Sequence, residues 1–146
     1  MRKIIYIDMD NTLANYSGHA RELNINPSEG KHIPGFFRNL KPMENAIESY
    51  NELSKYFDVY ILSTAPWSNP SSLVEKIEWI KEYLPSAYKN VIFSHHKELN
   101  IGAYLIDDST KNGASSFTGE HIQIGSERFP NWESVKNYIF NKENIF

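Results

Sequence analysis

The chain has 146 residues, enough for one globular domain with a sizeable core, and its formal net charge at pH 7 is -3. Its 15 Lys and Arg residues are scattered, which gives no indication of a surface for a nucleic-acid polymer or for a membrane. The absence of cysteine excludes disulfides, thiolate metal sites and a cysteine nucleophile.

Five short apolar segments predict β-strands. The first, second and fourth are nearly continuous in apolar residues, which is typical of parallel strands covered on both faces. The last alternates between polar and apolar residues, which favours a position at the edge of the sheet. The five segments span residues 3–8, 59–64, 90–95, 103–107 and 121–125.

Residues 14–37 follow the first strand and show little periodicity beyond a short helix near residues 18–24. Long irregular segments in compact domains are often lids or binding loops, so we expect a small cap insert here rather than an ordinary surface loop. The residues that interrupt regular structure in this segment are Gly18, Pro27, Gly30, Pro34 and Gly35.

Three helices are predicted between and after the strands, over residues 41–57, 69–84 and 131–140. Pro42 suits a first helical turn, and Asn69 and Asn131 are expected to cap the second and third helices. The alternation of strands and helices predicts one α/β domain over residues 1–146, with a Rossmann-like three-layer α/β/α arrangement around a mainly parallel sheet of about five strands. In the second helix we expect one buried face formed by Leu73, Ile77, Ile80 and Leu84.

Polar residues collect where these strands end. Ligands bind beyond the carboxyl ends of the strands in open α/β sheets, so these residues are expected to share one site. Several carboxylates together repel one another unless a cation lies among them, and oxygen ligands without cysteine favour Mg²⁺. A nearby hydroxyl and ammonium would hold a phosphate. The strand-end residues are Asp8 and Asp10, Ser63 and Thr64, His95 to Lys97, and Asp107 with Asp108.

Asp8 and Asp10 are separated by one residue, at a point where the chain must leave the strand and turn. One carboxylate can then face phosphorus while the other reaches the leaving oxygen. Asp8 could attack in line to form an aspartyl-phosphate. Asp10 could protonate the departing alkoxide and later deprotonate the attacking water. A polar strand end followed by a turn is the simpler alternative.

Other side chains have both a functional and a structural interpretation. Ser63 and Thr64 could cap a helix instead of holding phosphate, and Lys111 competes with Lys97 for the phosphate-binding role. Adjacent histidines on a strand point to opposite faces, so a joint metal site at residues 95 and 96 is not expected. Both are interpreted as local structure, and His96 is the one that could also line the site. Three aromatic residues could stack on a nucleobase or belong to the core: Phe36, Phe37 and Trp67.

The motifs at these strand ends resemble those of the haloacid dehalogenase superfamily. "DMDNTLA" is similar to its first motif in the phosphatase form, "VYILST" to its second, and "YLIDDS" to its acidic fourth motif, while Lys97 is placed like the lysine of the third. A closer resemblance is to the 5'(3')-deoxyribonucleotidases, through "GFFRNLKP", "ILSTAPW", "HKELNIGAYLIDD" and "FPNWESV".

This resemblance implies roles for individual residues. Asp8 would be the nucleophile and Asp10 the acid/base. Mg²⁺ would be held by Asp8, the Asp10 carbonyl and Asp108, with Asp107 supporting the metal-bound waters and Lys97. The phosphate would be held by Ser63, Thr64 and Lys97.

Two departures from the family pattern bear on the substrate. The chain has Ser109 where members often carry Arg after the acid pair, and residues 14–37 are shorter than the helical cap of the animal enzymes. Because the cap covers the nucleoside, these departures leave the base and sugar preferences open. The resemblance as a whole implies a phosphatase for deoxyribonucleoside monophosphates. The alternatives are a phosphatase for another small phosphomonoester, such as a sugar phosphate, and a nucleotide-binding module without turnover; a carbon-halogen hydrolase is disfavoured.

No apolar run approaches the roughly 20 residues that span a bilayer, and no signal peptide precedes the first predicted strand. We therefore expect a cytoplasmic protein whose partner is a small nucleotide or another phosphomonoester. Neither a membrane nor a nucleic-acid polymer is expected as a partner, and the sequence gives no signal for an oligomeric state.

Overall fold

Five parallel strands form one sheet in the order β3-β2-β1-β4-β5, in a computed structural model that describes residues 1–145. The predicted α/β fold is confirmed, and the last strand lies at the edge, as its alternating pattern indicated. The strands are β1 (Ile4–Ile7), β2 (Asp58–Ser63), β3 (Val91–Phe93), β4 (Tyr104–Ile106) and β5 (Glu120–Ile122).

The central strand β1 is paired on both sides, which explains its continuous apolar sequence. Ile5 is in register with Val59 of β2 and with Tyr104 of β4. Successive side chains of a strand point to opposite faces, so Ile5 and Ile7 enter the larger core while Tyr6 enters the smaller one. All three are buried.

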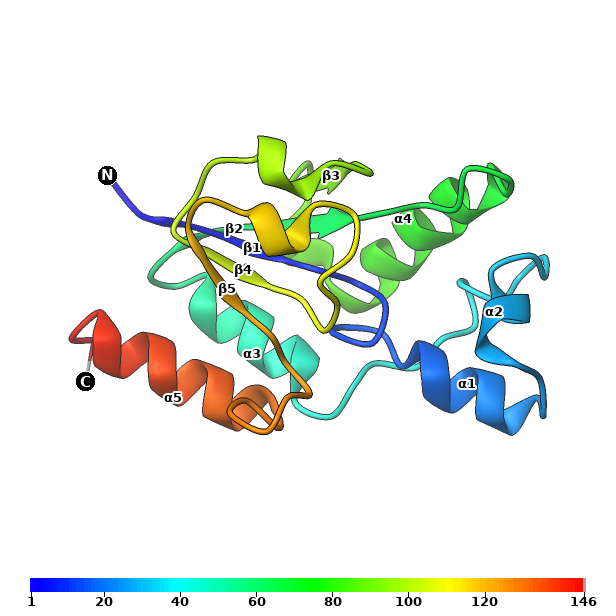
Figure 1. Cartoon of the computed structure of the whole chain (residues 1–146), viewed down its shortest axis with the longest axis horizontal. Helices are drawn as coiled ribbons and strands as arrows, with labels where there is room; N and C mark the ends of the chain where they lie inside the picture. Colours follow the sequence, from blue (N-terminus) through cyan, green and yellow to red (C-terminus); the bar gives the residue numbers. More distant parts are fainter. Residues whose placement is uncertain (146) are drawn as a thin grey trace.

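Helices cover the two faces of the sheet unequally (Figure 1). One face packs against α3 (Ala46–Leu53), α4 (Ser71–Tyr83) and α5 (Trp132–Lys142), which share the larger core. The other face is covered near β1 and β4 by the 3₁₀ turn η3 (Ala114–Ser116), through Ala114 and Phe117. The three predicted layers are therefore present, but one outer layer is reduced to short turns. The remaining 3₁₀ turns are η1 (Pro85–Ala87) and η2 (Lys97–Leu99).

Two predicted helix starts were wrong. The first helix begins at Ala46 because Asn45 takes a left-handed conformation with φ of 62°, and Pro42 instead forms an isolated bridge with Ala14. The second helix begins at Ser71, where the backbone carbonyl of Asn69 accepts from the N–H of Ser72. The third prediction is confirmed, since the Asn131 side chain caps α5.

The buried face of α4 also differs from the prediction. Leu73 is 40% exposed, whereas the polar Ser72 and Lys76 are buried together with Trp79 and Ile80. The helix is rotated so that Lys76, rather than Leu73, points into the protein. Ile80 and Leu84 of the predicted face are buried and Ile77 is half-buried, so the apolar pattern was wrong at Leu73 and missed Lys76, whose polar partners are described below.

The insert of residues 14–37 contains two short helices, α1 (Tyr16–Glu22) and α2 (Pro27–Gly30), which lie beyond the carboxyl ends of the strands (Figure 1). Glu75 of α4 binds its end, accepting from the backbone N–H groups of Gly35 at 3.1 Å and Arg38 at 3.2 Å. The insert is thus attached to the same helix that carries Lys76. Within residues 1–145, no helix has the length and apolarity required to cross a membrane.

Candidate active site

The end of β1 places two carboxyl groups beside a tight turn. Met9 is fully buried, and its carbonyl accepts from the N–H groups of residues 12, 13 and 14. Asn11 has φ of 59°, a left-handed conformation that Asn tolerates better than most residues. The indole of Trp132 donates to the Thr12 carbonyl at 2.9 Å and ties this turn to α5. Asp8 and Asp10 therefore stay close to the strand end.

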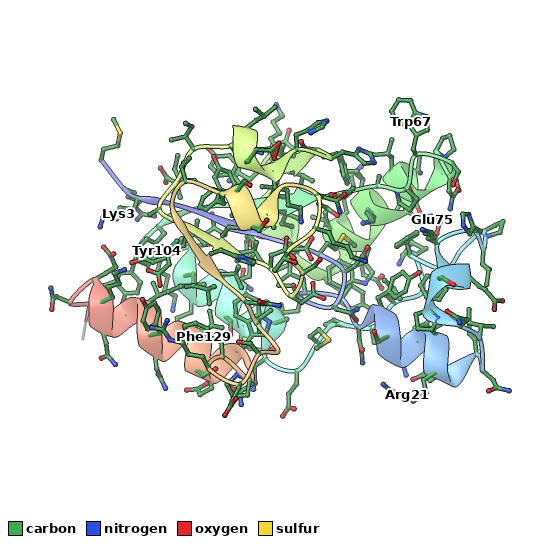
Figure 2. The ribbon with its side chains drawn as sticks, viewed as in Figure 1. Lys3, Arg21, Trp67, Glu75, Tyr104 and Phe129 are labelled. Carbon is green, nitrogen blue, oxygen red and sulfur yellow. The ribbon has the colours of Figure 1, made fainter. Side chains whose placement is uncertain are left out.

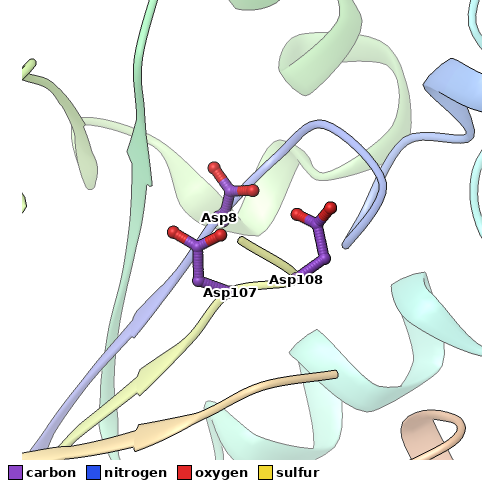
Figure 3. Close-up of side chains that lie close together, drawn as sticks. All are labelled: Asp8, Asp107 and Asp108. Atoms are coloured by element: carbon purple, nitrogen blue, oxygen red, sulfur yellow. The ribbon is translucent and has the colours of Figure 1, made fainter. Parts of the chain in front are cut away.

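Three aspartates from β1 and β4 converge at this edge of the sheet (Figure 3). One carboxylate oxygen from each of Asp8, Asp107 and Asp108 lies within 4.8 Å of the others. The hydroxyl of Thr12 lies 3.3 Å from Asp108 Oδ1 and 3.5 Å from Asp8 Oδ2. These segments are about 100 residues apart in sequence, and the pairing of β1 with β4 brings them together.

Lys97 is the cation of this cluster. It is 3% exposed, and its Nζ donates to Asp8 Oδ1 at 2.8 Å and to Asp107 Oδ2 at 2.6 Å. Its backbone N–H donates to the carbonyl of Asn112, next to Gly113. Gly113 has φ of +84°, and a Cβ at this position would lie 1.7 Å from a Glu98 carboxylate oxygen. Glycine is therefore required for this loop to pack closely against η2.

The other candidate lysine, Lys111, lines the same cavity but is exposed, whereas Lys97 binds two of the acids directly. The geometry therefore favours Lys97 over Lys111 as the charge that acts together with Asp8.

The electrostatics of the cluster fit a divalent cation. Burial, followed by the repulsion of Asp8, raises the pKa of both Asp107 and Asp108. Burial alone would lower the pKa of Lys97, but Asp8 and Asp107 raise it above its ordinary value. With all three carboxylates ionised around a bound cation, the acids and the one ammonium would leave two negative charges to balance it. Hard oxygen donors with this charge suit Mg²⁺, so the residues present fit the metal that the sequence predicts.

The acids open into a cavity of about 600 Å³ between the strand ends and the insert. Thr64 reaches this cavity, and its hydroxyl donates to the Ser94 carbonyl at 2.7 Å. Trp67, on the loop after β2, is 89% exposed and projects outward at its rim (Figure 2). The lining also includes Asp8, Asp10, Tyr16, Lys31, Phe37, His95, Lys97, Asp107, Asp108 and Ser109.

Some predicted residues lie elsewhere. Ser63 and Phe36 are buried and are not among the residues that line the cavity. Phe36 packs edge-on against Tyr16 and Phe37, which are themselves lining residues. His95 lines the cavity and His96 does not, so it was wrong to favour His96 as the histidine that could line the site. Of the residues predicted to contact the substrate, four line the cavity: Thr64, Lys97, Phe37 and Trp67.

Lys76 was missed at the sequence level. It is fully buried, and its Nζ donates to Asp10 Oδ2 at 3.0 Å and to Ser63 Oγ at 2.8 Å. Burial raises the pKa of Asp10, while the charge of Lys76 opposes that rise. The available signal was the spacing of Ser72, Lys76, Trp79 and Ile80, which places this lysine on the stripe that contains a tryptophan.

Comparisons with known proteins show which sequences this chain is similar to. A family model described as "5' nucleotidase, deoxy (Pyrimidine), cytosolic type C protein" matches residues 25–142. A "Putative 5'(3')-deoxyribonucleotidase" of Vibrio phage KVP40 is 51% identical, covering 94% of this chain and 85% of the relative. The "5'(3')-deoxyribonucleotidase" of Bacillus subtilis is 28% identical, covering 95% of this chain and 99% of the relative.

A solved structure supports the fold independently. A haloacid dehalogenase-like family hydrolase from Xanthomonas campestris matches with a TM-score of 0.66 over 99% of this chain and 97% of that protein. The sequence identity is 8%, so this likeness concerns the fold alone.

Proposed function

Because this chain belongs to the 5'(3')-deoxyribonucleotidase family of haloacid dehalogenase-like hydrolases, we propose that it is a Mg²⁺-dependent phosphatase acting on deoxyribonucleoside monophosphates. Family membership makes the chain a hydrolase of phosphoric monoesters. The proposal adds the metal, an aspartyl-phosphate on Asp8 and a substrate held under the insert of residues 14–37. We also propose that it acts in the cytoplasm.

The observation that carries the proposal is the cluster of Asp8, Asp107 and Asp108 with Lys97. A protein that only bound a nucleotide would gain nothing from three buried acids that repel the negatively charged phosphate. The same acids are useful if a metal and Lys97 neutralise both them and the phosphoryl group during its transfer.

In the first step, Asp8 attacks phosphorus in line and the bond from phosphorus to the ester oxygen breaks. The proton of Asp10 goes to the departing nucleoside oxygen. Lys97, which already donates to Asp8, orients the attacking carboxylate and balances charge on the phosphoryl oxygens. Thr64 lies at the cavity wall, and its hydroxyl, which donates to the Ser94 carbonyl, would turn from that carbonyl to donate to the phosphate.

In the second step, Asp10 takes a proton from water, the water oxygen attacks phosphorus, and the bond to the Asp8 carboxylate breaks to release inorganic phosphate. Asp8, Asp108 and the Asp10 carbonyl would hold Mg²⁺, with Asp107 supporting its waters. The ion would supply positive charge for the phosphoryl oxygens.

The walls above the acids favour a nucleotide over a smaller ester. A cavity of about 600 Å³ is within the usual size range for small-molecule sites. Phe37 and Tyr16 come from one side, and Trp67 stands at the rim with His95 nearby. Aromatic faces of this kind can stack on a nucleobase, which a sugar phosphate lacks.

Phosphate release from a panel of monophosphates, with Mg²⁺ and with EDTA, tests the proposal. The panel should contain deoxyribonucleotides and ribonucleotides with 5' or 3' phosphates, together with sugar phosphates. We expect Mg²⁺-dependent turnover with the highest kcat/KM for a deoxyribonucleotide. A preference for sugar phosphates would move the substrate to the alternative class, and nucleotide binding without phosphate release would make the protein a binding module.

A further inference from the structure

Lys76 lies at the centre of a buried polar cluster just behind the cavity. Its ammonium group has three N–H donors, and three oxygens surround it: Asp10 Oδ2 at 3.0 Å, Ser63 Oγ at 2.8 Å and the Thr64 carbonyl at 3.0 Å. The ring of Phe37 lies 4.9 Å from the same nitrogen. Every donor is thus matched by an acceptor, which fixes the position of the ammonium group.

A fully buried lysine is costly and is found in proteins when its charge is paired. Asp10 provides that pairing across 66 residues of sequence. Lys76 is not among the residues that line the cavity, so its position on α4 keeps it away from a bound substrate. Lys76 therefore does not reach the phosphate itself, and its effect on the site must pass through Asp10, Ser63 and Thr64.

Asp10 depends on this contact. Its Oδ2 binds Lys76, and within residues 1–145 its Oδ1 is buried without a hydrogen-bond partner. Lys76 is accordingly the one side chain in the described part of the chain that is seen to fix the Asp10 carboxyl group. Without it, that group would be free to rotate about its side-chain bonds.

We propose that Lys76 is a positioning residue that holds the Asp10 carboxyl group in the orientation needed for proton transfer, with Ser63 as part of the same support. This rests on the proposed function, in which Asp10 exchanges protons with the leaving oxygen and with water. Ser63 then contributes indirectly, by accepting a hydrogen bond from Lys76. Thr64, and not Ser63, lines the cavity at this strand end.

The proposal predicts a dependence on the leaving group. A nucleoside alkoxide is a poor leaving group and needs a proton, whereas p-nitrophenolate leaves readily without one. Because kcat/KM reports the steps up to the first irreversible one, it isolates phosphoryl transfer to Asp8 from the later hydrolysis. A misplaced Asp10 should therefore reduce kcat/KM for a nucleotide far more than for p-nitrophenyl phosphate.

The test compares Lys76→Met with Lys81→Met, which replaces an exposed lysine on the same helix. With Mg²⁺ present, we expect Lys76→Met to lower kcat/KM roughly 100-fold for a deoxyribonucleoside monophosphate and no more than about threefold for p-nitrophenyl phosphate. Lys81→Met should change neither. If circular dichroism shows that Lys76→Met does not fold, Lys76→Gln, which keeps an N–H donor, replaces it. The losses in kcat/KM for the nucleotide and for p-nitrophenyl phosphate are then compared in the same way.

Two further measurements separate positioning from general damage. In an Asp10→Asn background, Lys76→Met should cause little additional loss for the nucleotide, because both changes remove the same step. The chain has no cysteine, so Lys76→Cys can be alkylated at that position alone. Unfolding, treatment with 2-bromoethylamine and refolding would restore an ammonium group and with it the nucleotide activity, whereas a propyl group of similar length should not.

Equal losses for both substrates, or additive losses with Asp10→Asn, would overturn the positioning role. Those results are distinct from a failure of the proposed function, in which the unmodified protein would release no phosphate from nucleotides. Activity of the unmodified protein combined with equal losses in Lys76→Met would leave the proposed function standing and remove only the inference.

Discussion

Replacing Asp108 with Asn should stabilise the metal-free protein. Asp108 shares a confined space with Asp8 and Asp107, and burial together with the Asp8 charge raises its pKa from 3.8 to about 8. Asn has nearly the same shape, and its amide oxygen can still accept from the Thr12 hydroxyl, which lies 3.3 Å from Asp108 Oδ1. The substitution therefore removes an ionisable group while keeping its neighbours.

The size and sign of the effect follow from proton linkage. The folded protein keeps a proton on Asp108 that the unfolded chain loses, so the folded state loses relative stability as the pH rises from about 4 to about 8. Each unit of pKa difference corresponds to about 1.4 kcal/mol in the free energy of unfolding. Because neighbouring acids share the proton, we expect the carboxyl group of Asp108 to lower the free energy of unfolding at pH 7 by on the order of 2 to 4 kcal/mol. For a chain of this length that corresponds to roughly 5 to 15 °C in Tm.

Thermal unfolding of both proteins in EDTA at several pH values is the assay. The gain for Asp108→Asn should be near zero at pH 4 and largest at pH 8. Adding Mg²⁺ should then narrow the difference, because the unmodified protein gains more binding energy, about 2.7 kcal/mol at a metal concentration of 100 Kd, which is comparable to the advantage of Asp108→Asn. A gain that does not vary with pH, or an equal response of both proteins to Mg²⁺, would contradict the electrostatic account of the cluster.

Three other substitutions give distinct expectations. Asp8→Asn should abolish phosphate release while circular dichroism shows an intact fold; substantial remaining turnover would remove Asp8 from the nucleophile role. Lys97→Met should lower kcat/KM by at least roughly 100-fold yet keep the Mg²⁺-induced rise in Tm, because the three acids remain; a lost Tm response would show that Lys97 supports the metal site instead. Trp67→Ala should raise KM for nucleotides several-fold and leave the kinetics of p-nitrophenyl phosphate unchanged, and a uniform effect on both would argue against stacking at Trp67.

The sequence predicted the sheet because the strands at its centre, β1, β2 and β4, are covered on both faces and therefore read as nearly continuous apolar runs. It also predicted that Asp8 and Asp108 would meet, since parallel strands end at the same edge. That inference needed no knowledge of side-chain positions. The start of α3 was harder to predict, because a left-handed Asn45 does not interrupt the periodicity that signals a helix.

Lys76 shows why the rest of the site could not be predicted. Hydrophobic periodicity assigns a lysine to the solvent, and Leu73 and Ile77 offered a plausible apolar face beside it. In the structure Lys76 faces inward and binds Asp10, 66 residues away, and the Thr64 carbonyl. Interactions of this kind depend on tertiary geometry, which local pattern does not contain.

Tertiary geometry also determines which of Ser63 and Thr64 lines the cavity. Both end the same strand, and successive side chains point to opposite faces. Sequence alone could not decide which hydroxyl faces the cavity. In the structure Ser63 binds Lys76, while Thr64 lines the cavity.

Acid quenching during turnover would test most directly whether Asp8 receives the phosphoryl group. With Mg²⁺ and a deoxyribonucleoside monophosphate, rapid quenching followed by borohydride reduction should convert a single aspartate, Asp8, to homoserine, as identified by peptide mass spectrometry. EDTA should prevent the conversion. Homoserine at another position, or efficient turnover with Asp8 never modified, would contradict the account of this cluster as a phosphoryl-transfer site.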